Sequence, residues 1–83
     1  MAFTYILFSG MLDKYYVGAT NDAIEERLRR HLSNHDGFTS KAKDWNIVYY
    51  EEFDDISSAM KREKQIKKWK SRKLIEQLFT KVK

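Results

Sequence analysis

The 83-residue sequence contains no cysteine and no proline, and it has only three glycines. Without cysteine, neither disulfides nor thiolate metal sites can form. Because the chain has no proline, none of the expected helices is broken by that residue. No apolar run approaches the roughly 20 residues that a membrane-spanning helix requires, and the N-terminus lacks the basic and apolar segments of a signal peptide. We therefore expect a soluble, cytoplasmic protein.

The length favours one small domain, residues 1–83. A chain of this size buries only roughly 60–65% of the surface that it exposes when unfolded. Hydrophobic residues make up 42% of the chain, which is enough for a folded core although 34% of the residues are charged. We expect a shallow groove as the functional site, because so small a core leaves little room for a deep pocket.

The net charge of +4 is unevenly distributed. Residues 1–60 carry six Lys or Arg and ten Asp or Glu, a net of −4, whereas residues 61–83 carry ten and two, a net of +8. A basic C-terminal third indicates a surface for a polyanion such as nucleic acid. The alternative is a solvated lysine-rich helix that binds nothing in particular.

The strands follow from short apolar runs. Residues 3–8 and 15–19 are β-branched and aromatic, and the glycine and aspartate of residues 9–14 suit a turn, so this part predicts a β-hairpin. Both strands are apolar on both faces, which predicts a sheet covered on both sides. Residues 47–53 predict a third strand, and residues 35–45 have the composition of a polar loop.

Three helices follow from apolar spacing. Ile24, Leu28 and Leu32 recur at i, i+4 and i+8 in a helix expected to fade near residues 33–34. Asp54-Asp55 and Ser71 are candidate caps of two further helices. The apolar side chains expected on these two helices are Ile56, Ala59, Met60 and Ile66, then Leu74, Ile75, Leu78, Phe79 and Val82. The order β-β-α-β-α-α predicts an α+β fold, a small three-stranded antiparallel sheet flanked by helices.

Glu63 falls in the middle of the apolar face defined by Ile56, Ala59 and Met60. A carboxylate on a core-facing stripe is costly unless it is paired or binds a metal ion. A salt bridge to Arg27 or to a lysine is the structural alternative, and for an isolated carboxylate it is favoured.

Arg27 and His31 are spaced i, i+4 and share one face of the first helix, at the edge of the apolar stripe. Such an arginine can contact a phosphate bidentately, and such a histidine can exchange a proton near neutral pH. For His31 alone, a backbone-satisfied core histidine is favoured. His31 and His35 also stand i, i+4, but without further ligands they indicate zinc only weakly.

Tyr5 and Tyr16 lie on the two strands of the predicted hairpin. Strand tyrosines usually serve packing, and a phenol with a pKa near 10 is a poor base unless a guanidinium or a metal-bound water assists it. Gly18, inside a strand, indicates close approach of another group.

These residues together resemble the GIY-YIG nuclease family, over nearly the whole chain. Phe3-Thr4-Tyr5 matches the first motif, with Phe3 where the family name has glycine, and Tyr16-Val17-Gly18 matches the second, with valine for isoleucine. The family's arginine, histidine and glutamate fall on Arg27, His31 and Glu63. The segments 58–63 and 66–69 are similar to the small single-domain bacterial branch, which is like the nuclease module of structure-specific endonucleases.

The resemblance implies hydrolysis of a nucleic-acid phosphodiester with one divalent metal ion, Mg²⁺ or Mn²⁺, held by Glu63. Arg27 would neutralise charge on the phosphate, and Tyr5 would position or deprotonate the attacking water with help from Tyr16 and His31. DNA is the expected substrate over RNA, recognised by structure rather than by sequence, since no targeting domain is evident. The basic residues expected to grip the nucleic-acid backbone are Lys41, Lys61, Lys64, Lys67, Lys68 and Arg72.

Two other hypotheses remain open. One is a nucleic-acid-binding module of the same fold without catalysis. In such a module the tyrosines only pack, and a carboxylate such as Glu63 is not needed near the phosphate. The other is a small interaction subunit, whose Trp69 and third-helix apolar face bind a protein partner or a second copy of the chain.

Overall fold

The structure, a computed structural model, describes residues 1–33 and 41–80. The elements follow in the expected order, β-β-α-β-α-α. Their bounds are β1 Ala2–Ser9, β2 Lys14–Thr20, α1 Ile24–Ser33, β3 Asn46–Phe53, α2 Ile56–Trp69 and α3 Arg72–Gln77. Within the described residues, no helix has the length and apolar character that a membrane span requires.

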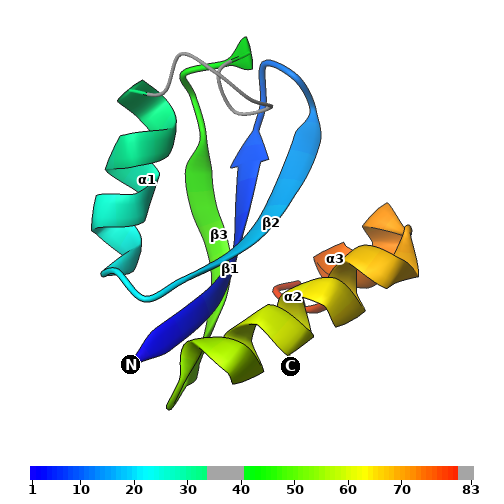
Figure 1. The fold of residues 1–83 in the computed structure, drawn as a ribbon. Coiled ribbons are helices and arrows are strands. Elements are labelled where there is room, and N and C mark those ends of the chain that lie inside the picture. The colour runs from blue at the N-terminus through cyan, green and yellow to red at the C-terminus, as the bar shows by residue number, and fades with distance from the viewer. Residues whose placement is uncertain (34–40, 81–83) are drawn as a thin grey trace.

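The three strands form one antiparallel sheet in the order β2-β1-β3. The β1–β2 hairpin turns through Asp13, which adopts a left-handed conformation with φ of 55°, as aspartate tolerates better than most residues. The central strand β1 is the most deeply buried, and β2 and β3 are the two edges. Helix α1 lies on one side of the sheet and α2 with α3 on the other (Figure 1). The prediction of a sheet covered on both faces is therefore confirmed.

Each face of the sheet carries its own apolar cluster, because alternate strand residues point to opposite faces. On the α1 side, Tyr5 and Leu7 pack with Leu28 and Leu32 of α1 and with Trp45. The cluster on the other side is made by Ile6, Val17, Tyr15, Val48, Tyr49, Ile66, Trp69, Ile75 and Leu78.

The helix caps anchor α2 and α3. Asp55 caps α2 by accepting a 2.7 Å hydrogen bond from the backbone N–H of Ser58, an interaction that stabilises a helix by about 1 kcal/mol. Ser71 caps α3 in the same way through Leu74. The Thr4 hydroxyl donates to the carbonyl of Ala59 at 2.6 Å, which fixes α2 against the central strand.

Three details differ from the sequence-based expectation. Met60 is 45% exposed and lies outside the core, because the face of α2 that meets the sheet runs through Ala59 and Ile66 instead. Ala42 and Trp45 are buried, at 3% and 2% exposure, so the segment expected to be a polar loop supplies core residues. Helix α3 ends at Gln77, earlier than its apolar pattern indicated. Val82 and residues 35–40 of the expected loop, with His35 among them, lie outside the described residues.

Candidate active site

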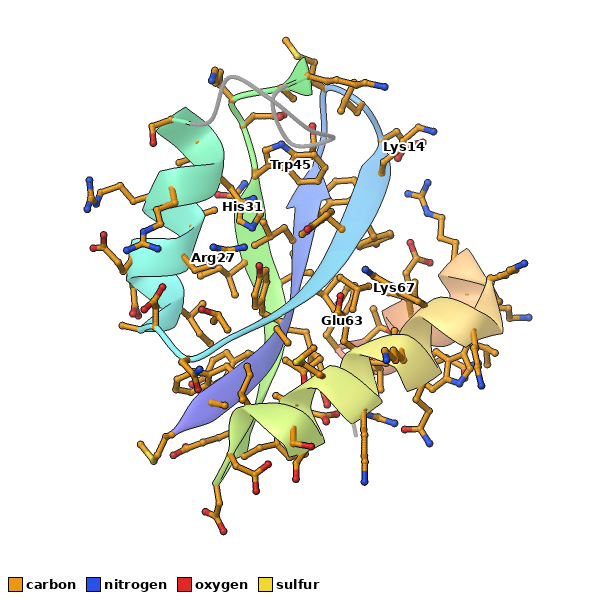
Figure 2. All side chains as sticks on the ribbon, in the orientation of Figure 1. Lys14, Arg27, His31, Trp45, Glu63 and Lys67 are labelled. Atoms are coloured by element: carbon orange, nitrogen blue, oxygen red, sulfur yellow. The ribbon has the colours of Figure 1, made fainter. Side chains whose placement is uncertain are left out.

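Tyr5 is the centre of a hydrogen-bonded cluster between β1 and α1. Its hydroxyl lies 2.9 Å from Nε2 of His31 and accepts a hydrogen bond from Nε of Arg27 at 3.3 Å. The i, i+4 spacing of Arg27 and His31 puts both side chains on the face of α1 that meets the sheet. Figure 2 shows them extending from α1 toward the strands.

Burial shifts the protonation equilibria of this cluster. Tyr5 is 1% exposed. Its burial raises the pKa of the phenol, although the Arg27 guanidinium acts in the opposite direction. Burial, followed by the nearby positive charge of Arg27, lowers the pKa of His31. His31 is therefore neutral at pH 7, and in the tautomer with its proton on Nδ1 it accepts the hydrogen bond of the Tyr5 hydroxyl at Nε2.

Gly18 makes room for the Tyr5 ring. The two residues are direct partners in the β1–β2 register. A Cβ added at Gly18 would lie 2.5 Å from the Tyr5 hydroxyl oxygen and 2.6 Å from its ring carbon Cζ. A side chain at position 18 would therefore require the Tyr5 ring to shift, which confirms the expectation that Gly18 marks a close approach.

Tyr16 joins this cluster to α2. Its ring lies edge-on to His31, with the ring centroids 5.0 Å apart. On its other side the Lys67 ammonium is 5.9 Å from the Tyr16 ring centroid. Because β2 is an edge strand, side chains from the two helical layers can meet around it. Figure 2 shows Glu63 and Lys67 rising from α2 toward β2, across from Arg27 and His31.

Glu63 forms an ion pair with Lys67, Oε2 to Nζ at 2.7 Å. The Glu63 side chain is 21% exposed and that of Lys67 is 51% exposed. The salt bridge to a lysine that the sequence left open is therefore present. The carboxylate is also close enough to Tyr5 to contribute to raising its pKa.

The donor set of this site is compatible with a hard divalent cation. Within residues 1–33 and 41–80, no three His, Cys, Asp or Glu residues gather around one point. Magnesium sites in phosphoryl enzymes commonly use one or two protein carboxylates, with substrate phosphates and water completing the shell. A single partly exposed carboxylate, Glu63, fits that pattern, whereas it does not fit a cage made by protein alone.

The structure thus brings together the five residues expected to carry chemistry, Tyr5, Tyr16, Arg27, His31 and Glu63. They come from four elements that meet at the β2 edge of the sheet. Two hollows of about 370 and 380 Å³ occur on the surface. Neither is lined by any of the five residues.

The expected nucleic-acid-binding residues are more dispersed. Lys61, Lys64 and Lys68 are exposed along α2, and Lys41 is exposed just before β3. Arg72 instead holds α3 to the β1–β2 turn, with ion pairs of 2.8 Å to Asp13 and 3.0 Å to Glu76. It already faces two carboxylates, so we expect Arg72 to contribute least to nucleic-acid binding.

Sequence reasoning missed the position of Lys67. Its charge alone placed it with the general basic surface, whereas the structure places its ammonium between Glu63 and Tyr16. The available signal was the i, i+4 spacing of Glu63 and Lys67, the orientation that favours an ion pair on a helix.

Comparison with protein-family models matches residues 1–76 to the GIY-YIG catalytic domain. The chain belongs to the GIY-YIG family. The match spans every described strand and nearly all of the three helices, and it includes all five clustered residues. Comparisons with curated proteins and with solved structures give no match. Membership of the family supports a nuclease-type fold and a nucleic-acid substrate.

Proposed function

We propose that this GIY-YIG protein is a metal-dependent endonuclease that cleaves DNA, directed by the structure of the substrate rather than by its sequence. In this proposal residues 1–83 form one nuclease domain that acts in the cytoplasm. The observation that carries the proposal is the hydrogen-bonded cluster of Tyr5, His31 and Arg27 beside the carboxylate of Glu63.

Glu63 is the residue that would hold Mg²⁺ or Mn²⁺. When bound there, the ion would supply Lewis-acid stabilisation of the oxygen that leaves phosphorus. The remaining chemistry falls to side chains of this protein.

Arg27 is suited to stabilise charge on the scissile phosphate. Its Nε is occupied by the Tyr5 hydroxyl, which fixes the guanidinium plane and leaves its two terminal nitrogens for phosphate oxygens. A donor held in advance costs little reorganisation when negative charge grows in the transition state.

The burial of Tyr5 argues for a division of labour between the two tyrosines. A phenol with a raised pKa and 1% exposure is poorly suited to take a proton from water directly. We propose that Tyr5 positions Arg27 and His31, and that Tyr16, which is partly exposed, orients the attacking water. His31 is neutral at pH 7 and would receive the proton by relay, in which the Tyr5 hydroxyl passes its proton to Nε2, 2.9 Å away, and takes one from the water in the same step, without forming a phenolate.

The exposed lysines of α2, Lys61, Lys64 and Lys68, would hold the nucleic-acid backbone, with Lys41 contributing from the segment before β3. Backbone contacts of this kind position a substrate without reading its sequence. A preference for duplex, flap, junction or single-stranded DNA would then follow from shape.

A panel of duplex, flap, junction and single-stranded DNA, with matched RNA, incubated in Mg²⁺ or in EDTA tests this function. We expect cleavage of at least one DNA form in Mg²⁺ and none in EDTA. Binding without cleavage in Mg²⁺ and in Mn²⁺ would favour the non-catalytic module instead. The Glu63–Lys67 ion pair supports that second candidate, because it gives the carboxylate a partner without a metal ion.

A further inference from the structure

Lys67 places its charge beside the carboxylate that would hold a cation. Its ammonium is 2.7 Å from Glu63 Oε2, so a metal ion bound to that oxygen would have a like charge a few ångströms away. Like charges at such separations repel each other in water, and more strongly where solvent is partly excluded.

The Lys67 side chain also has an alternative place for its charge. It is 51% exposed and lies over the Tyr16 ring at 5.9 Å. A lysine has a long flexible stem, so the ammonium can leave Glu63 for an anion placed beside Tyr16. A phosphate of the nucleic acid would be such an anion.

We propose that Lys67 couples metal binding to substrate binding. In the free protein it neutralises Glu63 and weakens metal binding. A bound phosphate draws the ammonium away and frees the carboxylate for the ion. This inference rests on the proposed metal role of Glu63, and it makes Lys67 a positioning residue rather than one more backbone contact.

Linkage makes the coupling reciprocal. If nucleic acid strengthens metal binding by removing Lys67 from Glu63, the metal strengthens nucleic-acid binding by the same factor. The protein would thereby avoid holding a hydrolytically competent metal ion in the absence of substrate.

The direct experiment measures Mn²⁺ affinity of the full chain without nucleic acid, by titration calorimetry or by the electron paramagnetic resonance signal of free Mn²⁺. Lys67→Met keeps the length of the side chain and removes its charge. We expect it to bind Mn²⁺ about tenfold more tightly than wild type, because the half-exposed ammonium acts largely through water, where a unit charge a few ångströms away has an effect of about this size. Lys67→Arg keeps the charge and should retain the weak binding of wild type.

Lys73→Met is the matched control. Lys73 is exposed on α3 and forms no ion pair within the described part of the chain, so this variant changes net charge equally without touching Glu63. We expect it to alter Mn²⁺ affinity by no more than about twofold, because exposed charges farther apart are screened by salt. An equal gain in Lys67→Met and Lys73→Met would overturn the coupling, since general electrostatics would then suffice.

Glu63→Gln separates the failure of this inference from failure of the proposed function. If Glu63→Gln binds Mn²⁺ as wild type does, the proposed metal site is wrong and the coupling falls with it. If Glu63→Gln loses binding but Lys67→Met gains none, the metal site stands and the coupling alone is overturned. In a second titration, a short DNA strand should increase the Mn²⁺ affinity of wild type by a larger factor than that of Lys67→Met. An equal increase in both would also contradict the proposal.

Discussion

At the scale of single residues, the Tyr5 hydroxyl organises the site through two partners that the chain places 22 and 26 positions away. The roles of Tyr5, Arg27 and His31 are separable by substitution, because each contributes a different group to the cluster. Gly18 contributes only the space that the cluster needs.

Arg27→Ala and Tyr5→Phe should slow the chemical step more than they weaken binding. The Arg27 guanidinium would meet charge that grows only in the transition state, and Tyr5→Phe releases that guanidinium from its 3.3 Å hydrogen bond. Removing one such donor typically costs about 10²–10³ in rate. Single-turnover cleavage, measured beside a binding isotherm in Ca²⁺, checks this. A collapse of affinity with an unchanged saturated rate would assign both residues to binding instead.

Gly18→Ala should damage both the fold and the site. The added Cβ would meet the Tyr5 hydroxyl at 2.5 Å, and overpacking of this kind typically costs about 1–3 kcal/mol of stability. Urea unfolding and cleavage rate measure the two effects. Gly10→Ala is the control, because its Cβ would lie 3.7 Å from Asp44 Oδ2, an ordinary contact. Equal stability of the two variants would show that Tyr5 moves aside without cost.

At the scale of secondary-structure elements, α1 and α2 contribute different things to the site. Helix α1 presents Arg27 and the buried His31 to the sheet. Helix α2 presents Glu63 and Lys67 at the β2 edge and a row of exposed lysines elsewhere. Each contribution has its own measurable signature.

His31 should make the stability of the α1 packing dependent on pH. Burial and Arg27 lower the pKa of His31 in the folded state from its ordinary 6.5. The unfolded chain therefore binds a proton more readily, and stability present above pH 6.5 is lost as the pH falls below that value. The free energy of unfolding in urea should decline by at most about 1.4 kcal/mol per pH unit from this group. His31→Gln should flatten that decline, and an unchanged decline would contradict the role given to His31.

The lysines of α2 should set the salt dependence of DNA binding. Each phosphate contact contributes about −0.9 to the slope of log K against log salt for duplex DNA. The double variant Lys64→Ala/Lys68→Ala should make this negative slope shallower by up to about 2. The relative affinities for DNA of different sequences should stay the same. Lys14→Ala/Lys43→Ala removes the same charge from other elements and should change the slope less. The reverse order would place the DNA-binding surface elsewhere.

The elements themselves were predictable because their signals are local. Short runs of β-branched and aromatic residues indicated the strands, and the spacing of Ile24, Leu28 and Leu32 indicated α1. The caps at Asp55 and Ser71 were also found from the sequence. Such features depend on neighbouring residues and not on the tertiary arrangement.

Features that depend on tertiary packing escaped prediction. Trp45 lies among polar residues in the sequence, yet it fills the cluster between α1 and the sheet. Met60 fits the apolar pattern of α2, yet it is exposed because α2 meets the sheet through Ala59 and Ile66. In the site, the sequence left the partner of Glu63 open between Arg27 and a lysine. The structure pairs Glu63 with Lys67, whose ammonium lies near the Tyr16 ring.

At the scale of the whole molecule, two unlike halves meet at the β2 edge of the sheet. The hairpin and α1 supply aromatic rings, a guanidinium and an imidazole, and the basic C-terminal third supplies a carboxylate within a net charge of +8. This arrangement would draw a polyanion toward the carboxylate of Glu63. In the proposed mechanism, metal-dependent cleavage depends on Glu63 more than on any other residue.

Single-turnover cleavage of the best DNA substrate by wild type and by Glu63→Gln, in Mg²⁺, tests that claim most directly. Glutamine keeps the shape of the side chain and removes the charge that a hard cation requires. We expect Glu63→Gln to lose metal-dependent cleavage while it unfolds in urea at nearly the wild-type midpoint, because a partly exposed i, i+4 ion pair contributes only about 0.3–0.5 kcal/mol. Full cleavage by a folded Glu63→Gln protein would contradict the account.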